Sequence, residues 1–385
     1  MAWQQPSRVT IVEQATLRRP NVFGPDVISL ASGDPSGLVP RAVVEAVEKA
    51  VGEAKFGYAH PDGLPALRTV VAGQLSQATG RELGAADVLV TSGASSGLGA
   101  VAFGLLSPGD RVLLPSPVYS LYADVVRLAG AIPEFVSCEP PDYQLPLDDL
   151  ETAADGAAAI FICNPCNPTG AVYPPAALRS LGAIAERHDL LVISDEAYSS
   201  VIFPPAQFSS AISIPELAPR VVLVDTFSKR LCITGLRLGY VTAAPPYLSA
   251  IRRAHRTLVG PVNTPVQMAI ARVLADEATF RTALLEEFTA RRADVFAELS
   301  TAPEVSFQPP RGTFYAFFAI RGVADSDRAS RALVAHGVAV RPGAEFGKGG
   351  EGSIRVAFCG DRTELREGLR RLVAAIPAVQ ASQEA

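Results

Sequence analysis

The sequence predicts an α/β fold: a doubly wound, mostly parallel seven-stranded sheet, accompanied by a smaller α+β domain. Short apolar runs rich in Val, Ile and Leu alternate with helical patterns, as in parallel sheets with crossover helices. Polar motifs follow several of these runs, where such sheets bind ligands. After about residue 280 the pattern changes to a long charged helix with fewer strands. A length of 385 residues accommodates both units.

Seven apolar runs supply the expected strands of the large sheet, in chain order 87–91, 111–115, 132–136, 158–163, 190–195, 221–226 and 238–241. Helical patterns connect them at 98–106, 121–129 and 174–188. The second unit is expected to contain a helix at 280–299, strands within 312–320 and 352–359, and a further helix. We therefore expect a large domain at 45–280 and a small domain built from 1–44 and 281–385.

Composition excludes several kinds of partner. The net charge is −5, and the charges of both signs are interspersed, so neither nucleic acid nor an anionic membrane is indicated. A long uncharged stretch, 88–109, is rich in Gly, Ser and Thr and is unsuited to crossing a bilayer. The N-terminus lacks the pattern of a signal peptide, so we expect a cytoplasmic protein.

The cysteines fit the same cellular location. There are five, an odd and scattered set that indicates reduced thiols. Cys163 and Cys166 have the spacing of a redox motif, but a proline-closed turn follows them immediately and argues against that role.

A loop that could bind phosphate follows the first strand. Thr91–Gly99 (TSGASSGLG) lies between a strand and a helix, so its amides and hydroxyls can face a phosphate at the helix N-terminus. A plain turn is the structural alternative. The loop also looks like that of short-chain dehydrogenases, but it lies far from the N-terminus. Moreover, none of the four lysines has the tyrosine four residues earlier that those enzymes need.

Two further motifs lie at the carboxyl ends of apolar strands. Asn164–Gly170 (NPCNPTG) stacks two Asn-Pro dipeptides, a strong turn signal that presents the Asn167 amide. Asp195 is the last residue of the next strand. A carboxylate there can be a helix cap, a metal ligand or the counter-ion of a buried cation. Because no His or carboxylate cluster surrounds it in sequence, a metal is not expected. A protonated ring nitrogen is a cation that needs such a partner.

The fourth motif contains Lys229, directly after the Val-rich strand 221–226. A lysine there is costly to bury unless it is neutral or covalently bonded, as in an imine; a surface lysine is the alternative. Thr226, Ser228 and Arg237 supply hydroxyls and a guanidinium suited to a phosphate.

Taken in order, the four motifs resemble one family, the class I/II aminotransferases among the fold-type I pyridoxal-phosphate enzymes. The resemblance covers nearly the whole chain. It implies pyridoxal 5′-phosphate as cofactor, Lys229 as the Schiff-base lysine within Ser-Lys and Gly-x-Arg-x-Gly, and Asp195 as the partner of the ring nitrogen. It also implies an aminotransferase acting on an L-amino acid and a 2-oxo acid, working as a homodimer.

The resemblance assigns roles to the remaining site residues. Asn167 and Tyr198 match the groups bonded to the ring's phenolic oxygen, and Tyr119 matches the aromatic stacked on the ring. Tyr58 resembles a tyrosine that reaches the phosphate of the neighbouring subunit. The phosphate site is matched by Gly93, Ala94, Ser95, Thr226, Ser228 and Arg237, and the substrate-carboxylate site by Gly33, Asn167 and Arg355. Arginine suits that site because its planar fork grips a carboxylate at two points. Tyr58 and Tyr119 could instead be core aromatics, and Arg355 a surface ion pair.

The reaction type and the substrate stay more open than the cofactor. The same residues serve carbon–sulfur β-elimination, decarboxylation and oxidative deamination on this fold, because the pocket selects the bond that breaks. A regulatory protein without turnover is disfavoured by Lys229, Asp195 and Arg355 occurring together. Arg18, Arg19 and Arg256 could select an acidic side chain if they point inward, but an outward orientation is favoured.

Overall fold

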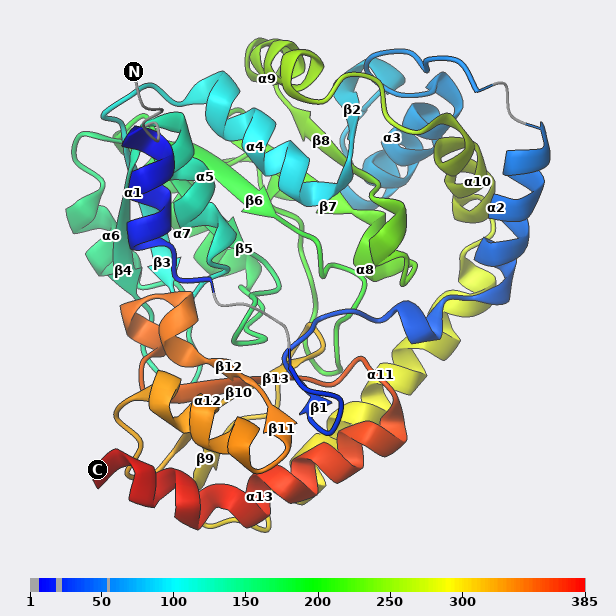
Figure 1. The fold of residues 1–385 in the computed structure, drawn as a ribbon. Coiled ribbons are helices and arrows are strands. Elements are labelled where there is room, and N and C mark those ends of the chain that lie inside the picture. Colours follow the sequence, from blue (N-terminus) through cyan, green and yellow to red (C-terminus); the bar gives the residue numbers. More distant parts are fainter. Residues whose placement is uncertain (1–6, 19–22, 54–55, 385) are drawn as a thin grey trace, which may run out of the picture.

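The structure, a computed structural model, describes residues 7–18, 23–53 and 56–384. Its centre is a seven-stranded sheet in the order β2-β8-β7-β6-β5-β3-β4 (Figure 1). Strand β8 runs antiparallel to both neighbours, and the other pairs are parallel. The strands are β2 (Val88–Thr91), β3 (Arg111–Ser116), β4 (Ile132–Ser137), β5 (Ala157–Cys163), β6 (Leu191–Asp195), β7 (Val221–Thr226) and β8 (Gly239–Ala243). The predicted α/β fold with its seven strands is confirmed.

Helices surround this sheet and bury its apolar strands. They are α2 (Arg41–Glu53), α3 (Pro65–Thr79), α4 (Gly93–Leu105), α5 (Leu121–Ala129), α6 (Leu147–Ala153), α7 (Pro175–Arg187), α8 (Phe227–Arg230), α9 (Pro245–Leu258) and α10 (Thr264–Leu274). Among the described helices, none combines the length and apolar character needed to span a bilayer.

A second, four-stranded sheet has the order β12-β13-β10-β9 and lies beside three helices. Its elements are α11 (Ala278–Leu299), β9 (Val305–Phe307), β10 (Tyr315–Ile320), α12 (Ser326–Ala335), β12 (Arg341–Pro342), β13 (Ser353–Ala357) and α13 (Arg362–Glu384). Nearby, β1 (Ile28–Ser29) pairs with β11 (Val338–Ala339). Segments from both ends of the chain therefore meet in this part of the molecule.

The N-terminal helix α1 (Ser7–Ala15) packs against α5 beside the large sheet. Thr16 Oγ1 donates to Asp124 at 2.9 Å, and Arg127 donates to the Ala15 carbonyl at 3.2 Å. These contacts hold Ala15 and Thr16 against α5.

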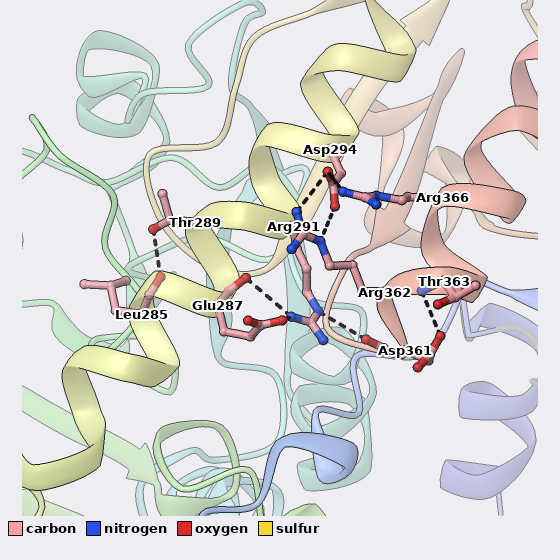
Figure 2. Close-up of polar contacts among 10 residues, drawn as sticks. Leu285, Glu287, Thr289, Arg291, Asp294, Asp361, Arg362, Thr363 and Arg366 are labelled. Atoms are coloured by element: carbon pink, nitrogen blue, oxygen red, sulfur yellow. Dashed lines mark hydrogen bonds and ion pairs between the residues drawn. The ribbon is translucent and has the colours of Figure 1, made fainter.

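Ion pairs fix the long helix α11 against α13 (Figure 2). Asp294 accepts from Arg362 at 2.6 Å and from Arg366 at 2.8 Å. Arg291 is buried and contacts both Glu287 and the carbonyl of Gly360. Gly360 lies in the segment that follows β13. This segment is thereby bonded to α11.

Two buried carboxylates lie side by side within the large sheet. The register that pairs Asp195 with Val224 places Glu196 next to Asp225, and both line one cavity of about 450 Å³. Successive residues of a strand point to opposite faces, so this cavity lies behind the face that bears Asp195. Tyr240 donates to Asp225 at 2.9 Å, while Ser194 Oγ and the Ala211 amide donate to Glu196. Despite these bonds, burial raises the pKa of Glu196 to about 8 and that of Asp225 to about 7.

These raised pKa values predict a loss of stability with rising pH. Unfolded carboxyls release their protons near pH 4. Between pH 5 and 8 these two carboxyls therefore bind more protons in the folded chain than in the unfolded chain, so their contribution to stability falls as the pH rises. Glu196→Gln keeps an acceptor for the Ala211 amide but cannot ionise. Between pH 5 and 8.5 the unfolding temperature of both proteins should fall. We expect the fall to be a few degrees smaller for Glu196→Gln than for the parent. The exposed Glu186→Gln is the control and should follow the parent; equal slopes in all three proteins would refute the assignment.

Candidate functional site

The predicted site residues converge on one cavity of about 390 Å³ at the carboxyl ends of β5, β6 and β7. Twelve of them line it, namely Gly33, Ala94, Ser95, Tyr119, Asn167, Asp195, Tyr198, Thr226, Ser228, Lys229, Arg237 and Arg355. Gly93 lies just behind, where an added Cβ would stand 2.9 Å from the Arg237 guanidinium. Residues far apart in sequence thus form one site because parallel strands end at the same edge.

Asp195 is the buried anion of the site, with only 4% of its surface exposed. Burial raises the pKa of its carboxyl, while bonds from Tyr122 and the Ala197 amide act in the opposite direction. Tyr122 Oη donates to Oδ2 at 2.8 Å, and the amide donates to Oδ1 at 3.1 Å. A carboxylate held in this way is a ready partner for a cationic group in the cavity.

Lys229 projects from the short helix α8 that follows β7. Its Nζ donates to the Gly33 carbonyl at 2.7 Å and lies 5.8 Å from the centre of the Phe314 ring. Burial lowers the pKa of this amine, which increases the fraction present as a neutral nucleophile or base. Lys229 therefore has the environment of a reactive amine rather than of a surface lysine.

One corner of the cavity gathers hydrogen-bond donors suited to an anion. The first amides of α4 have no partner within their helix, and Ser92 provides no side-chain cap. Arg237 adopts the left-handed conformation (φ 52°, ψ 64°), which costs a non-glycine residue roughly 1–2 kcal/mol. Its guanidinium faces Gly93.

Of the two hydroxyls next to Lys229 that the sequence assigned to the phosphate, only one is a free donor. Thr226 Oγ1 donates to the Leu238 carbonyl at 2.9 Å and accepts from the Ser228 amide, so its hydrogen is already engaged. Ser228 Oγ is buried and has no hydrogen-bond partner among the described residues. Ser228 thus offers the free hydroxyl.

Arg355 approaches from β13 of the second sheet. Its guanidinium donates to Asn167 Oδ1 at 3.0 Å and to the Ala31 carbonyl at 2.6 Å. It also lies 4.2 Å from the centre of the Tyr315 ring, while its Nε has no partner in the described part of the chain. The buried Asn167 links this arginine to the large sheet.

The other residues that line the cavity include Tyr122, Tyr315, Arg341, Glu345 and Arg18, which sequence reasoning missed or misplaced. Arg18 lines the cavity, contrary to the outward orientation we favoured. Arg256 instead donates to Asp62 at 2.8 Å, and Arg19 lies outside the described residues. No short motif marks these positions, although the aromatic residues in 314–318 were a usable signal.

Tyr58 is the one predicted site residue that lies apart. Its side chain is 95% exposed, and it lines a separate hollow with Phe56, which is 78% exposed. Within the described residues, no group of three or more His, Cys, Asp or Glu side chains could hold a metal ion.

Comparisons with known proteins agree with this geometry. The model of the family "Aminotransferase class I and II" matches residues 25–372. The chain is 30% identical to an aspartate aminotransferase of Pyrococcus horikoshii, covering 91% of each chain. It is also 30% identical to the aspartate/prephenate aminotransferase of Thermus thermophilus, covering 90% of each. The structure of an aromatic aminotransferase from P. horikoshii superimposes with a TM-score of 0.89 at 30% identity, covering 97% of this chain and 99% of the other.

Proposed function

Because this chain belongs to the class I and II aminotransferase family, we propose that it binds pyridoxal 5′-phosphate and that Lys229 attaches the cofactor covalently. As an aminotransferase, it moves an amino group between an amino acid and a 2-oxo acid. None of the relatives described above is named as a lyase. The observation that carries the proposal is a buried Asp195 and a reactive Lys229 in one cavity with an anion-binding corner.

The residues present fit this cofactor on structural grounds. Ser228 Oγ, the first amides of α4 and Arg237 form a donor set for a phosphate. Asp195 supplies the negative charge for a protonated ring nitrogen, and Tyr119 offers an aromatic face in the same cavity. Asn167 and Tyr198 are the candidates for hydrogen bonds to the ring oxygen. When bound, pyridoxal phosphate supplies an aldehyde that condenses with amines and a ring that accepts an electron pair.

Residues of the chain itself bind the substrate and move its proton. Arg355, held by Asn167 and Tyr315, binds the α-carboxylate of the amino acid and thereby orients its α-carbon. Once the substrate amino group displaced it from the cofactor, Lys229 Nζ would be a free amine that removes the proton from that carbon and delivers it to the cofactor carbon that receives the amino group. Burial lowers the pKa of Lys229, so a larger fraction of this amine is neutral at physiological pH.

We also propose that the substrate has an acidic side chain. Arg341 lies directly opposite Arg355 in the pairing of β12 with β13, and Glu345 contacts it at 3.2 Å. Arg18 adds a positive charge on the same cavity. Glu345 offsets one of the two additional arginines, so a net positive charge remains for a second carboxylate. The names of the aspartate aminotransferase relatives support this assignment.

Further proposals concern assembly and location. The exposed Phe56 and Tyr58 support a homodimer in which Tyr58 reaches the phosphate of the neighbouring subunit. All five cysteines are buried and free, which supports the cytoplasm. The division into a domain at 45–280 and a domain of 1–44 and 281–385 stays a prediction.

Lys229→Ala tests the cofactor and its attachment. The parent should absorb visible light, as expected for a conjugated cofactor imine. After borohydride reduction, peptide mass spectrometry should find the cofactor on Lys229. Lys229→Ala should lose this attachment and at least about a thousandfold of turnover, because it removes both nucleophile and base. Lys348→Ala is the control. A parent that takes up no added cofactor would refute the proposal.

Arg341→Leu tests the acidic substrate. We expect kcat/KM for aspartate and glutamate to fall roughly tenfold to a hundredfold, the effect of losing one charge-assisted hydrogen bond. The value for alanine should change little. The exposed Arg179→Leu should alter neither. A parent enzyme that prefers uncharged side chains, or an equal loss with alanine, would contradict this assignment.

Hybrid dimers test the shared site. Lys229→Ala and Tyr58→Ala chains, each impaired alone, should regain activity when they are unfolded together and refolded as a mixture. Each hybrid dimer then contains one site with both native residues. Lys229→Ala mixed with Asp195→Asn is the control and should not recover, because both residues come from the same chain. Hybrids that form without recovering activity would show that Tyr58 does not cross the interface.

A further inference from the structure

Tyr315 contacts three parts of the site that the proposed function treats separately. It is the first residue of β10, is only 3% exposed, and lines the cavity. Tyr315 pairs with Ala357 and Phe317 pairs with Arg355, so Tyr315 is the diagonal neighbour of Arg355 on the same face. Its position between the two sheets suggests a linking role.

The ring of Tyr315 supports the carboxylate-binding arginine. The Arg355 guanidinium carbon lies 4.2 Å from the ring centre, and a second ring, Phe346, lies 5.0 Å away. A guanidinium over an aromatic face is stabilised by the ring quadrupole, most strongly away from water. This contact restricts the plane of the guanidinium, which determines how its two donors meet a carboxylate.

The hydroxyl of Tyr315 lies against the other side of the site. Tyr315 Oη is 3.0 Å from Tyr198 Oη, and the two rings pack edge to face. A Cβ added to Gly33 would lie 1.8 Å from Tyr315 Oη, so the hydroxyl occupies the space that the missing side chain leaves. Gly33 is also the residue whose carbonyl accepts from Lys229.

The chemistry of two phenols gives this hydrogen bond a direction. Burial raises the pKa of Tyr315 to about 12 and that of Tyr198 well above its usual value, so each keeps its proton. If Tyr198 donates its only hydrogen to the oxygen of the cofactor ring, its own oxygen can only accept from Tyr315. A chain of donors in one direction strengthens each bond in it.

We propose that Tyr315 is a positioning residue that couples the substrate-carboxylate site to the cofactor: its ring aligns Arg355, and its hydroxyl strengthens the donor Tyr198. The two functions belong to different atoms of one side chain, so different substitutions separate them. This inference rests on the proposed cofactor and its attachment to Lys229.

Tyr315→Phe keeps the ring and removes the hydroxyl. Tyr198 should then donate more weakly to the ring oxygen, so the deprotonated form of the bound cofactor is less stabilised. The pH midpoint of its absorbance change should rise by about 0.5–1 unit, the equivalent of one hydrogen bond. Binding of a 2-methyl amino acid, which has no α-proton to lose, should stay within about twofold of the parent.

Tyr315→Leu removes the ring as well. We expect the dissociation constant of the same 2-methyl amino acid to rise roughly threefold to thirtyfold, as the aromatic support of Arg355 is lost. The buried Tyr173→Phe is the control for a lost hydroxyl outside the cavity and should change neither readout. Circular dichroism and unfolding temperature check that each variant is folded.

The outcomes separate this inference from the proposed function. A parent without the cofactor on Lys229 refutes the proposed function before the variants are compared. If the parent carries it, an unchanged absorbance midpoint in Tyr315→Phe overturns the role of the hydroxyl. Binding by Tyr315→Leu that equals the parent's overturns the role of the ring.

Discussion

A carboxylate held almost entirely away from water, Asp195, is the constraint on which the site depends. Burying a charge is expensive unless partners compensate for it, and here the partners come from several elements. Tyr122 reaches it from α5 and the Ala197 amide from its own loop, while Lys229 lies beyond β7 in the same cavity. The strands must end at one edge for these groups to meet, so the parallel order of β5, β6 and β7 is a requirement of the chemistry.

The second sheet contributes an arginine to the site. Arg355 lies on β13, and the end of that strand is tied to α11 through Arg291 and the Gly360 carbonyl. Its guanidinium nevertheless bonds to Asn167 on the large sheet. In the proposed role of Arg355, recognition of the substrate carboxylate bridges both sheets, so a displacement between the sheets would alter this contact.

The sequence predicted those features that local patterns encode. Apolar runs located the seven strands, and residues next to them, such as Asp195 and Lys229, converge as expected. Tyr122 escaped notice because a tyrosine within an amphipathic helix resembles a core aromatic. Arg341 and Tyr315 depend on antiparallel register, which no motif carries. The engagement of the Thr226 hydroxyl with Leu238 was unpredictable because the partner lies across a turn.

The close fit between Gly33 and Tyr315 has an evolutionary consequence. A methyl group at position 33 and a phenol at position 315 cannot share the same space, so position 33 cannot gain a side chain while the phenol remains. A lineage that acquired a side chain at 33 would first need a smaller residue at 315, and would meanwhile lose the contact with Tyr198. Two positions almost three hundred residues apart should therefore vary together among descendants of this chain, a correlation that arises from sterics without any direct role for Gly33 in the chemistry.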